Sequence, residues 1–138
     1  MKARAIQKEL GEPVQREVEK ALASLLETPG ILGARIIFRE GQQAHHRGVD
    51  YGHMNDFSVL AASLLNGGEF LLHEIGHGGD VRVILKSDTT RVHLSSLGDE
   101  YFLATVADIA QPWHAMRPAV QRARRQLMGM LRARPHAE

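Results

Sequence analysis

The stretch that decides the fold is residues 25–42, which read LLETPGILGARIIFREGQ. The tripeptide Thr28-Pro29-Gly30 ends a helix, because proline has no amide hydrogen and glycine takes a positive φ without steric cost. Residues 31–38 are then apolar on both faces, which is typical of a fully covered strand, and Glu40-Gly41 predicts a hairpin turn. A covered strand that directly follows a helix implies helices on both faces of one sheet.

The composition is that of a globular protein without cysteine chemistry. With 138 residues, of which 43% are hydrophobic and 24% charged, the chain is long enough to bury a core. The lack of cysteine excludes disulfides and thiol catalysis, and leaves histidine and carboxylates as metal ligands. There is no signal-peptide pattern and no membrane-length apolar run, so we expect a cytoplasmic protein without membrane insertion. We expect one domain over residues 1–138.

Hydrophobic periodicity predicts eight elements in the order α-β-β-α-β-β-β-α. Helical spacing of apolar residues predicts helices over 14–26, about 56–75, and from 113 or 118 onward. Short runs between turn residues predict strands over about 34–39, 42–48, 81–86, 91–97 and 101–107. The second strand is polar, which suits the edge of a sheet.

The predicted middle helix is apolar on two faces. We expect one face to pack on the sheet, made of Phe57, Leu60, Ala61, Leu64, Gly68, Leu71 and Ile75. The opposite face is apolar and small for a surface in water, and carries Val59, Ala62, Ser63, Asn66 and Phe70. Gly67-Gly68 either break the helix in two or allow close approach of another backbone. The stripe keeps one phase across them, so we expect a continuous helix that makes a protein–protein contact.

Taken together, this order and spacing resemble the roadblock family, which includes dynein light chains of roadblock type and bacterial MglB-like GTPase regulators. The matching features are the helix end at 25–30, the Glu40-Gly41 hairpin, the small-residue helix, the glycine-rich exit at 76–80 and the hairpin at 97–103. The resemblance covers a core at about 14–131, and two features depart from the family pattern, His45-His46 and Pro118. The resemblance implies a profilin-like α/β fold of the α+β type. It has a five-stranded antiparallel sheet of order 2-1-5-4-3, with the outer helices on one face and the middle helix on the other.

The resemblance also implies a homodimer that pairs the 81–86 edge strands and packs the middle helices. An uncovered apolar edge strand is a pairing hazard unless a partner takes it. We therefore expect a dimer or partner-binding surface of Val59, Ala62, Ser63, Asn66, Gly67, Phe70, Val81, Val83 and Ile84. The implied partner is a Ras-like small GTPase, which this non-enzymatic module scaffolds or activates. No glycine-rich phosphate loop occurs in the sequence, so no cofactor is expected.

A different function is suggested by residues 73–77, which read HEIGH and match the H-E-x-x-H motif of zinc peptidases. The alternative is therefore a zinc-dependent hydrolase that uses His73, Glu74 and His77. That motif needs both histidines on one helical face. Gly76, Gly78 and Gly79 crowd the second histidine, so we expect the helix to end before it and no zinc to bind.

For two further sets of residues we expect solvated side chains rather than a binding site. His45 and His46 point to opposite faces of a strand and cannot readily share a metal with His53, so we expect a solvated pair. Residues 111–138 carry six arginines against one glutamate, which leaves an anion-binding module open. Its candidate residues are Arg122, Arg124, Arg125 and Arg132. Aromatic residues are scarce at 5%, so we expect a solvated basic face and no nucleic-acid partner.

Overall fold

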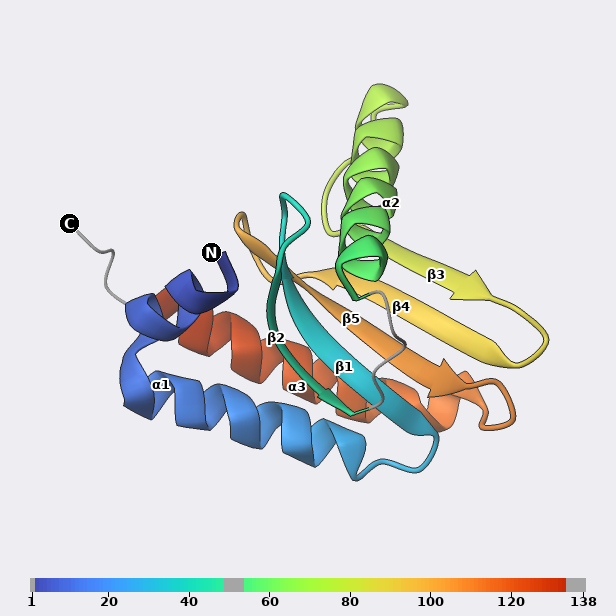
Figure 1. Ribbon diagram of the computed structural model, residues 1–138. Coiled ribbons are helices and arrows are strands. Elements are labelled where there is room, and N and C mark those ends of the chain that lie inside the picture. The colour runs from blue at the N-terminus through green and yellow to red at the C-terminus, as the bar shows by residue number, and fades with distance from the viewer. Residues whose placement is uncertain (1, 49–53, 134–138) are drawn as a thin grey trace.

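The computed structural model describes residues 2–48 and 54–133, which form three helices and five strands (Figure 1). The helices are α1 (Lys2–Leu26), α2 (Met54–Glu74) and α3 (Trp113–Ala133). The strands are β1 (Ile31–Phe38), β2 (Gln43–Gly48), β3 (Arg82–Lys86), β4 (Thr90–Ser96) and β5 (Tyr101–Asp108). The predicted order of elements is confirmed. His53 lies outside the described residues.

The stretch 25–42 folds as the sequence predicts. The last turn of α1 closes with the amide of Thr28 donating to the carbonyl of Leu25, and Gly30 follows with φ +94°. Strand β1 is buried along almost its whole length. The β1–β2 hairpin turns at Gly41, where φ is +110° and the amide of Phe38 donates to the carbonyl of Gln42 at 2.8 Å. A helix end, a covered strand and a hairpin therefore follow one another within eighteen residues.

The five strands form one antiparallel sheet in the order β2-β1-β5-β4-β3, which confirms the predicted order. Helices α1 and α3 pack side by side on one face, and α2 lies on the other (Figure 1). Strand β3 ends the sheet, so one row of its backbone amides and carbonyls points outward. The C-terminal end of α2 projects beyond the sheet (Figure 1).

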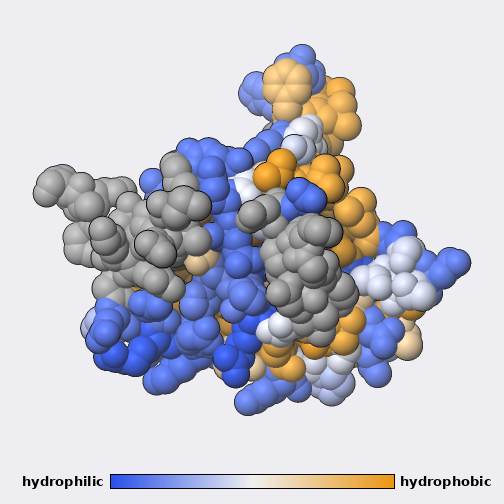
Figure 2. All heavy atoms as spheres, in the orientation of Figure 1, coloured by the Kyte–Doolittle hydropathy of each residue, from blue (hydrophilic) through white to orange (hydrophobic). Residues whose placement is uncertain are grey.

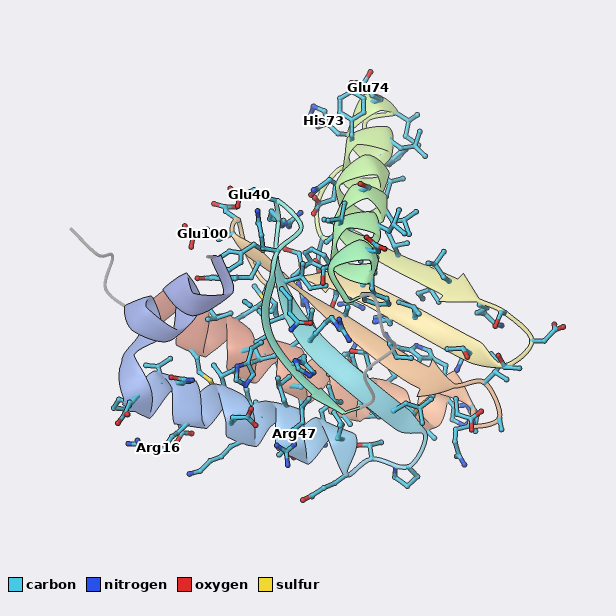
Figure 3. The ribbon with its side chains drawn as sticks, in the orientation of Figure 1. Arg16, Glu40, Arg47, His73, Glu74 and Glu100 are labelled. Atoms are coloured by element: carbon cyan, nitrogen blue, oxygen red, sulfur yellow. The ribbon has the colours of Figure 1, made fainter. Side chains whose placement is uncertain are left out.

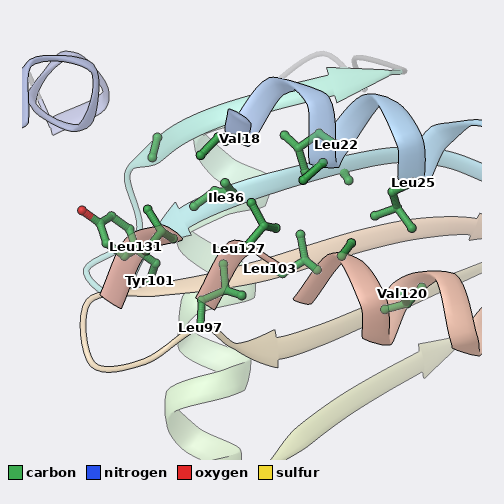
Figure 4. Close-up of a cluster of buried hydrophobic side chains, with 14 of the residues drawn as sticks. Val18, Leu22, Leu25, Ile36, Leu97, Tyr101, Leu103, Val120, Leu127 and Leu131 are labelled. Carbon is green, nitrogen blue, oxygen red and sulfur yellow. The ribbon is translucent and has the colours of Figure 1, made fainter. Parts of the chain in front are cut away.

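The core consists of two layers divided by the sheet. The larger layer fills the space between the sheet and the α1/α3 pair, and is centred on Leu22, Ile36, Leu103 and Leu127 (Figure 4). The smaller layer lies under α2 and contains Ile37, Ala61, Ala62, Leu65, Leu94, Phe102 and Ala104. Because the second layer is thin, much of α2 keeps its side chains out of the core.

Each of the two outer helices contains a proline. Helix α1 runs back to Lys2 and contains Pro13, which was expected in its first turn. Its first turns lie at an angle to the remainder (Figure 1), as expected where a proline removes a helical hydrogen bond. Helix α3 starts at Trp113 and continues through Pro118. The first of the two predicted starts is therefore confirmed, and Pro118 lies inside the helix.

Candidate interaction surface

The face of α2 that packs on the sheet carries small side chains. Ser58, Ala61, Ala62 and Leu65 are buried there, at helical spacings of three and four residues. The sequence prediction for this face was wrong for the large residues, because Leu60, Leu64, Leu71 and Ile75 are exposed. The sheet itself supplies the bulk, since Ile37, Leu94 and Phe102 fill the layer from below. Little space remains between these side chains and α2, so the helix packs there with a face of small residues.

The orientation of α2 is fixed by Arg39 at the end of β1. Its guanidinium forms a bidentate ion pair with Glu69 of α2 and donates to Ser96 Oγ at 2.9 Å and to the Gly98 carbonyl at 3.1 Å. Asn66 joins the same cluster, because its Nδ2 donates to the Arg39 carbonyl at 2.9 Å. Arg39 therefore ties α2 to both the β1 end and the β4–β5 hairpin.

Replacing Arg39 by alanine is expected to lower the free energy of unfolding by about 2 kcal/mol, because several charge-assisted hydrogen bonds of a largely buried guanidinium are lost together. Urea denaturation measures this loss. The matched control is Arg47→Ala, because Arg47 is half exposed and pairs with Glu19 at the surface, where such pairs contribute about 0.5 kcal/mol. Equal losses for the two variants would contradict the role given to Arg39.

The residues predicted for the outward face of α2 divide into two groups. Val59, Ser63, Asn66, Gly67 and Phe70 are exposed, and Phe70 is the most exposed of the large ones at 65%. Ala62 is 4% exposed and packs on the sheet, so it has almost no surface to offer a partner. The prediction was wrong for Ala62, because the face of α2 that carries it packs on the sheet.

The predicted edge-strand residues also point in different directions. Val81 is buried at 4% exposure, so its side chain is not part of an open surface. Val83 faces α2, where a Cβ added to Gly68 would lie 3.1 Å from its Cγ2 atom. Ile84 is half exposed and, being next in the strand, points to the α3 side of the sheet. Gly68 thus lets α2 lie close to β3, within the same chain.

A continuous apolar surface joins α2 to the open edge of the sheet. Gly68 contacts β3, whereas Asn66, Glu69 and Val59 contact the β1 end and the β1–β2 hairpin. The side of α2 near β3 therefore carries the exposed large residues, and Figure 2 shows apolar side chains gathered along α2. We call this the α2–β3 surface, consisting of Leu60, Leu64, Leu71 and Ile75 of α2 with Leu85 of β3. The sequence pattern contained this stripe but assigned it to the core.

The H-E-x-x-H residues do not lie on one helix. Helix α2 ends at Glu74, and the amide of Gly76, at φ +80°, donates to the His73 carbonyl. The amide of His77 donates to the Leu72 carbonyl at 2.8 Å, which completes a Schellman motif. His77 therefore follows a left-handed glycine, while His73 and Glu74 lie at the far end of α2 (Figure 3). The geometry of a zinc-peptidase helix is not formed.

We predict that the protein binds no stoichiometric zinc through His73 and His77. A zinc site needs ligand nitrogens at about 2.0–2.1 Å from one metal ion, and the turn at Gly76 separates the two rings. Within the described residues, no group of three or more His, Asp or Glu side chains is arranged to hold a metal. Metal analysis of protein prepared with added zinc, compared with a His73→Ala variant, measures this. Stoichiometric zinc that disappears in the variant would restore the hydrolase alternative.

The histidines of β2 are not both solvated. His45 is largely buried and bonds through Nε2 to Glu19 of α1, and Arg47 donates to the same carboxylate at 3.1 Å. His46 points the other way and contacts Gln43 at 3.1 Å. The expected opposite orientation is confirmed, and His45 has a structural role, because it ties the edge strand to α1. The contacts of Glu19 with β2 were not predicted, because no pattern in the sequence links Glu19 to that strand.

The arginines of α3 also divide by position. Arg122 and Arg125 are exposed, as expected of a solvated face. Arg124 is largely buried, because its Nε donates to the Ser96 carbonyl at 2.9 Å and its Nη2 to Asp80 at 2.8 Å. The side chain of Arg132 lies outside the described part of the structure. The expected water-facing position of Arg124 is therefore wrong.

No helix among the described residues is long and apolar enough to cross a membrane.

A family model described as the Roadblock/LC7 domain matches residues 17–107. A search of functionally curated proteins found no match.

Several solved structures share the whole fold. "MglB with tetrameric arrangement" is similar with 20% identity and a TM-score of 0.79, covering 91% of this chain and 94% of that one. Myxococcus xanthus MglB has 12% identity and a TM-score of 0.81, covering 88% and 92% of the two chains. A Roadblock/LC7 domain from Streptomyces avermitilis has 21% identity and a TM-score of 0.75, covering 83% and 97%. At these identities the structures establish the fold.

Proposed function

The chain belongs to the Roadblock/LC7 family, and on that premise we propose that it is a homodimeric interaction module that binds and regulates a Ras-like small GTPase. The observation that carries the proposal is the α2–β3 surface. Five large apolar residues, each at least 42% exposed, lie along one side of α2 and on the strand beside it. An exposed apolar patch of this kind marks an interaction site rather than a surface adapted to water.

The first partner of this surface is a second copy of the chain. The outward backbone groups of β3 can pair with the same strand of a copy related by two-fold symmetry, which extends the sheet across both protomers. The same operation brings two α2 helices together along the stripe that lies nearest β3. One partner then covers both the open strand edge and Leu60, Leu64, Leu71 and Ile75. We expect such an interface to bury more than the roughly 1,000 Å² that a specific contact needs.

The surface left for a GTPase is the other exposed side of α2. Val59, Ser63 and Phe70 lie away from β3, so a dimer formed through the α2–β3 surface leaves them accessible. A largely exposed aromatic ring such as Phe70 is a typical anchor at a protein interface. The family resemblance supports a small GTPase as the occupant, either scaffolded or stimulated to hydrolyse GTP.

The test uses a Ras-like GTPase from the same organism, preferably one encoded beside this chain. The GTPase is loaded with GDP or with a non-hydrolysable GTP analogue, immobilised, and titrated with the protein. We expect binding that depends on the nucleotide and is weakened about tenfold or more by Phe70→Glu. The matched control is Arg16→Glu on exposed α1, which is expected to bind as wild type. Absence of binding in both nucleotide states would contradict the proposal, and the rate of GTP hydrolysis separates activation from scaffolding.

A further inference from the structure

A group of cations converges on the α3 side of the sheet, at the opposite face from α2. Strand β3 presents Arg82, Ile84 and Lys86 there, beside Ser95, His93 and Arg91 of β4 in the antiparallel register. Helix α3 borders this region with Trp113 and Arg124, whose side chains contact β4. Arg117, one turn after Trp113, lies on the same side of α3. We call this the basic surface, made of Arg82, Lys86, Arg91, Arg117 and Arg124 around His93.

The charges of this surface act on one buried imidazole. Burial, and after it the positive charges of Arg82, Arg124 and Arg91, together lower the pKa of His93 from 6.5 to about 4. Three guanidinium groups therefore lie close enough to the His93 ring to lower its pKa. Among the described residues, Asp80 forms ion pairs with this group, with Arg124 at 2.8 Å and with Arg82 at 3.5 Å. The positive charges of the basic surface outnumber these two ion pairs.

We infer that the basic surface binds an acidic segment of a partner protein, whose Asp and Glu carboxylates would pair with the exposed Arg82, Lys86 and Arg117. The inference needs only one protomer and does not depend on the proposed dimer or GTPase. Ile84, half exposed between Arg82 and Lys86, offers an apolar contact for a side chain of the same segment. A mixed acidic and apolar peptide therefore matches the chemistry of this surface.

The depth of the cations favours a peptide over other anions. Arg91 is 7% exposed, and the Arg124 side chain is 14% exposed, so a flat bilayer cannot approach their guanidinium groups closely. A single-stranded nucleic acid would need a free aromatic face for its bases. The Trp113 ring already packs against His93, with centroids 4.5 Å apart, and against Arg91. An extended peptide can place single carboxylates beside the exposed Arg82, Lys86 and Arg117.

The experiment measures binding of a fluorescent Glu- and Asp-rich peptide to the full chain at low ionic strength. The counterpart peptide with Gln and Asn in place of the acids is the neutral control. We expect the double variant Arg82→Glu/Lys86→Glu to weaken binding about tenfold or more, and Arg117→Glu about fivefold. Arg117→Glu leaves β3 unchanged, so its effect cannot arise from altered strand pairing. The matched control Arg122→Glu/Arg125→Glu reverses the same charge on the exposed side of α3 and is expected to change binding less than about twofold.

A second readout locates the bound peptide. Imidazole NMR of the complex is expected to show an upward shift of the His93 pKa, because peptide carboxylates offset the nearby guanidinium charges. Peptide binding that leaves His93 unchanged, or equal loss in the two double variants, would overturn the inference. Tighter binding to anionic vesicles or single-stranded RNA than to the peptide, abolished by Arg117→Glu, would also overturn it by assigning the surface to another class of partner.

Discussion

Replacing Leu64 by arginine is expected to turn the dimer into a monomer at micromolar concentration. Leu64 lies in the middle of the α2–β3 surface and is 44% exposed in one chain. In the proposed dimer its side chain is buried, so the substitution removes apolar contact area and buries an unpaired guanidinium. Together these effects cost about 3 kcal/mol or more, which raises the dissociation constant at least a hundredfold or so.

The matched control is Ser63→Arg, which places the same side chain one position away, about 100° around the helix. Ser63 points away from β3, so this variant is expected to remain a dimer while binding a GTPase less well. Sedimentation velocity on both variants over a range of concentrations gives the comparison. If Ser63→Arg dissociated the protein and Leu64→Arg did not, the interface would lie on the other side of α2.

Acidification is expected to destabilise the fold through His93. Burial, and then Arg82, Arg124 and Arg91, hold the His93 pKa at about 4, whereas a histidine in the unfolded chain has its ordinary pKa of 6.5. The folded pKa is depressed, so between these values the unfolded chain binds a proton that the folded chain does not. The free energy of unfolding therefore falls as pH decreases from 6.5 to 4, by up to about 3 kcal/mol.

Urea denaturation at pH 7 and pH 4.5, at one protein concentration, measures this loss. The variant His93→Leu removes the titrating ring from its buried position, so its stability is expected to vary less with pH than that of wild type. His46→Leu is the control at an exposed position of β2. An equal pH dependence in wild type and His93→Leu would show that other groups control acid stability.

The sequence predicts the topology well because local signals determine it. The helix end at Thr28-Pro29-Gly30, the Glu40-Gly41 turn and the two later hairpins each depend on neighbouring residues. Helix α2 is continuous through Gly67-Gly68, as its single apolar phase indicates. The strand order came from the family resemblance rather than from the residues. Its confirmation reflects the shared fold.

What the sequence could not predict is which apolar stripe of α2 faces the sheet. Leu60, Leu64, Leu71 and Ile75 are larger than Ser58, Ala61 and Ala62, so a hydrophobicity pattern assigns the larger set to the core. In the structure the smaller set faces the sheet, because Phe102 and Ile37 of the sheet already fill the layer under α2. A core stripe and an interface stripe have the same composition in one sequence. Long-range contacts such as those from Glu19 to His45 and from Arg124 to Ser96 likewise leave no local pattern.

The central claim is that the α2–β3 surface joins two copies of this chain, and the mass of the wild-type protein in solution tests it most directly. Sedimentation equilibrium at tens of micromolar is expected to give twice the 15.3 kDa mass of the chain. That mass should fall to that of one chain in Leu64→Arg under the same conditions. A wild-type protein that sediments as a single 15.3 kDa chain at this concentration would contradict the claim.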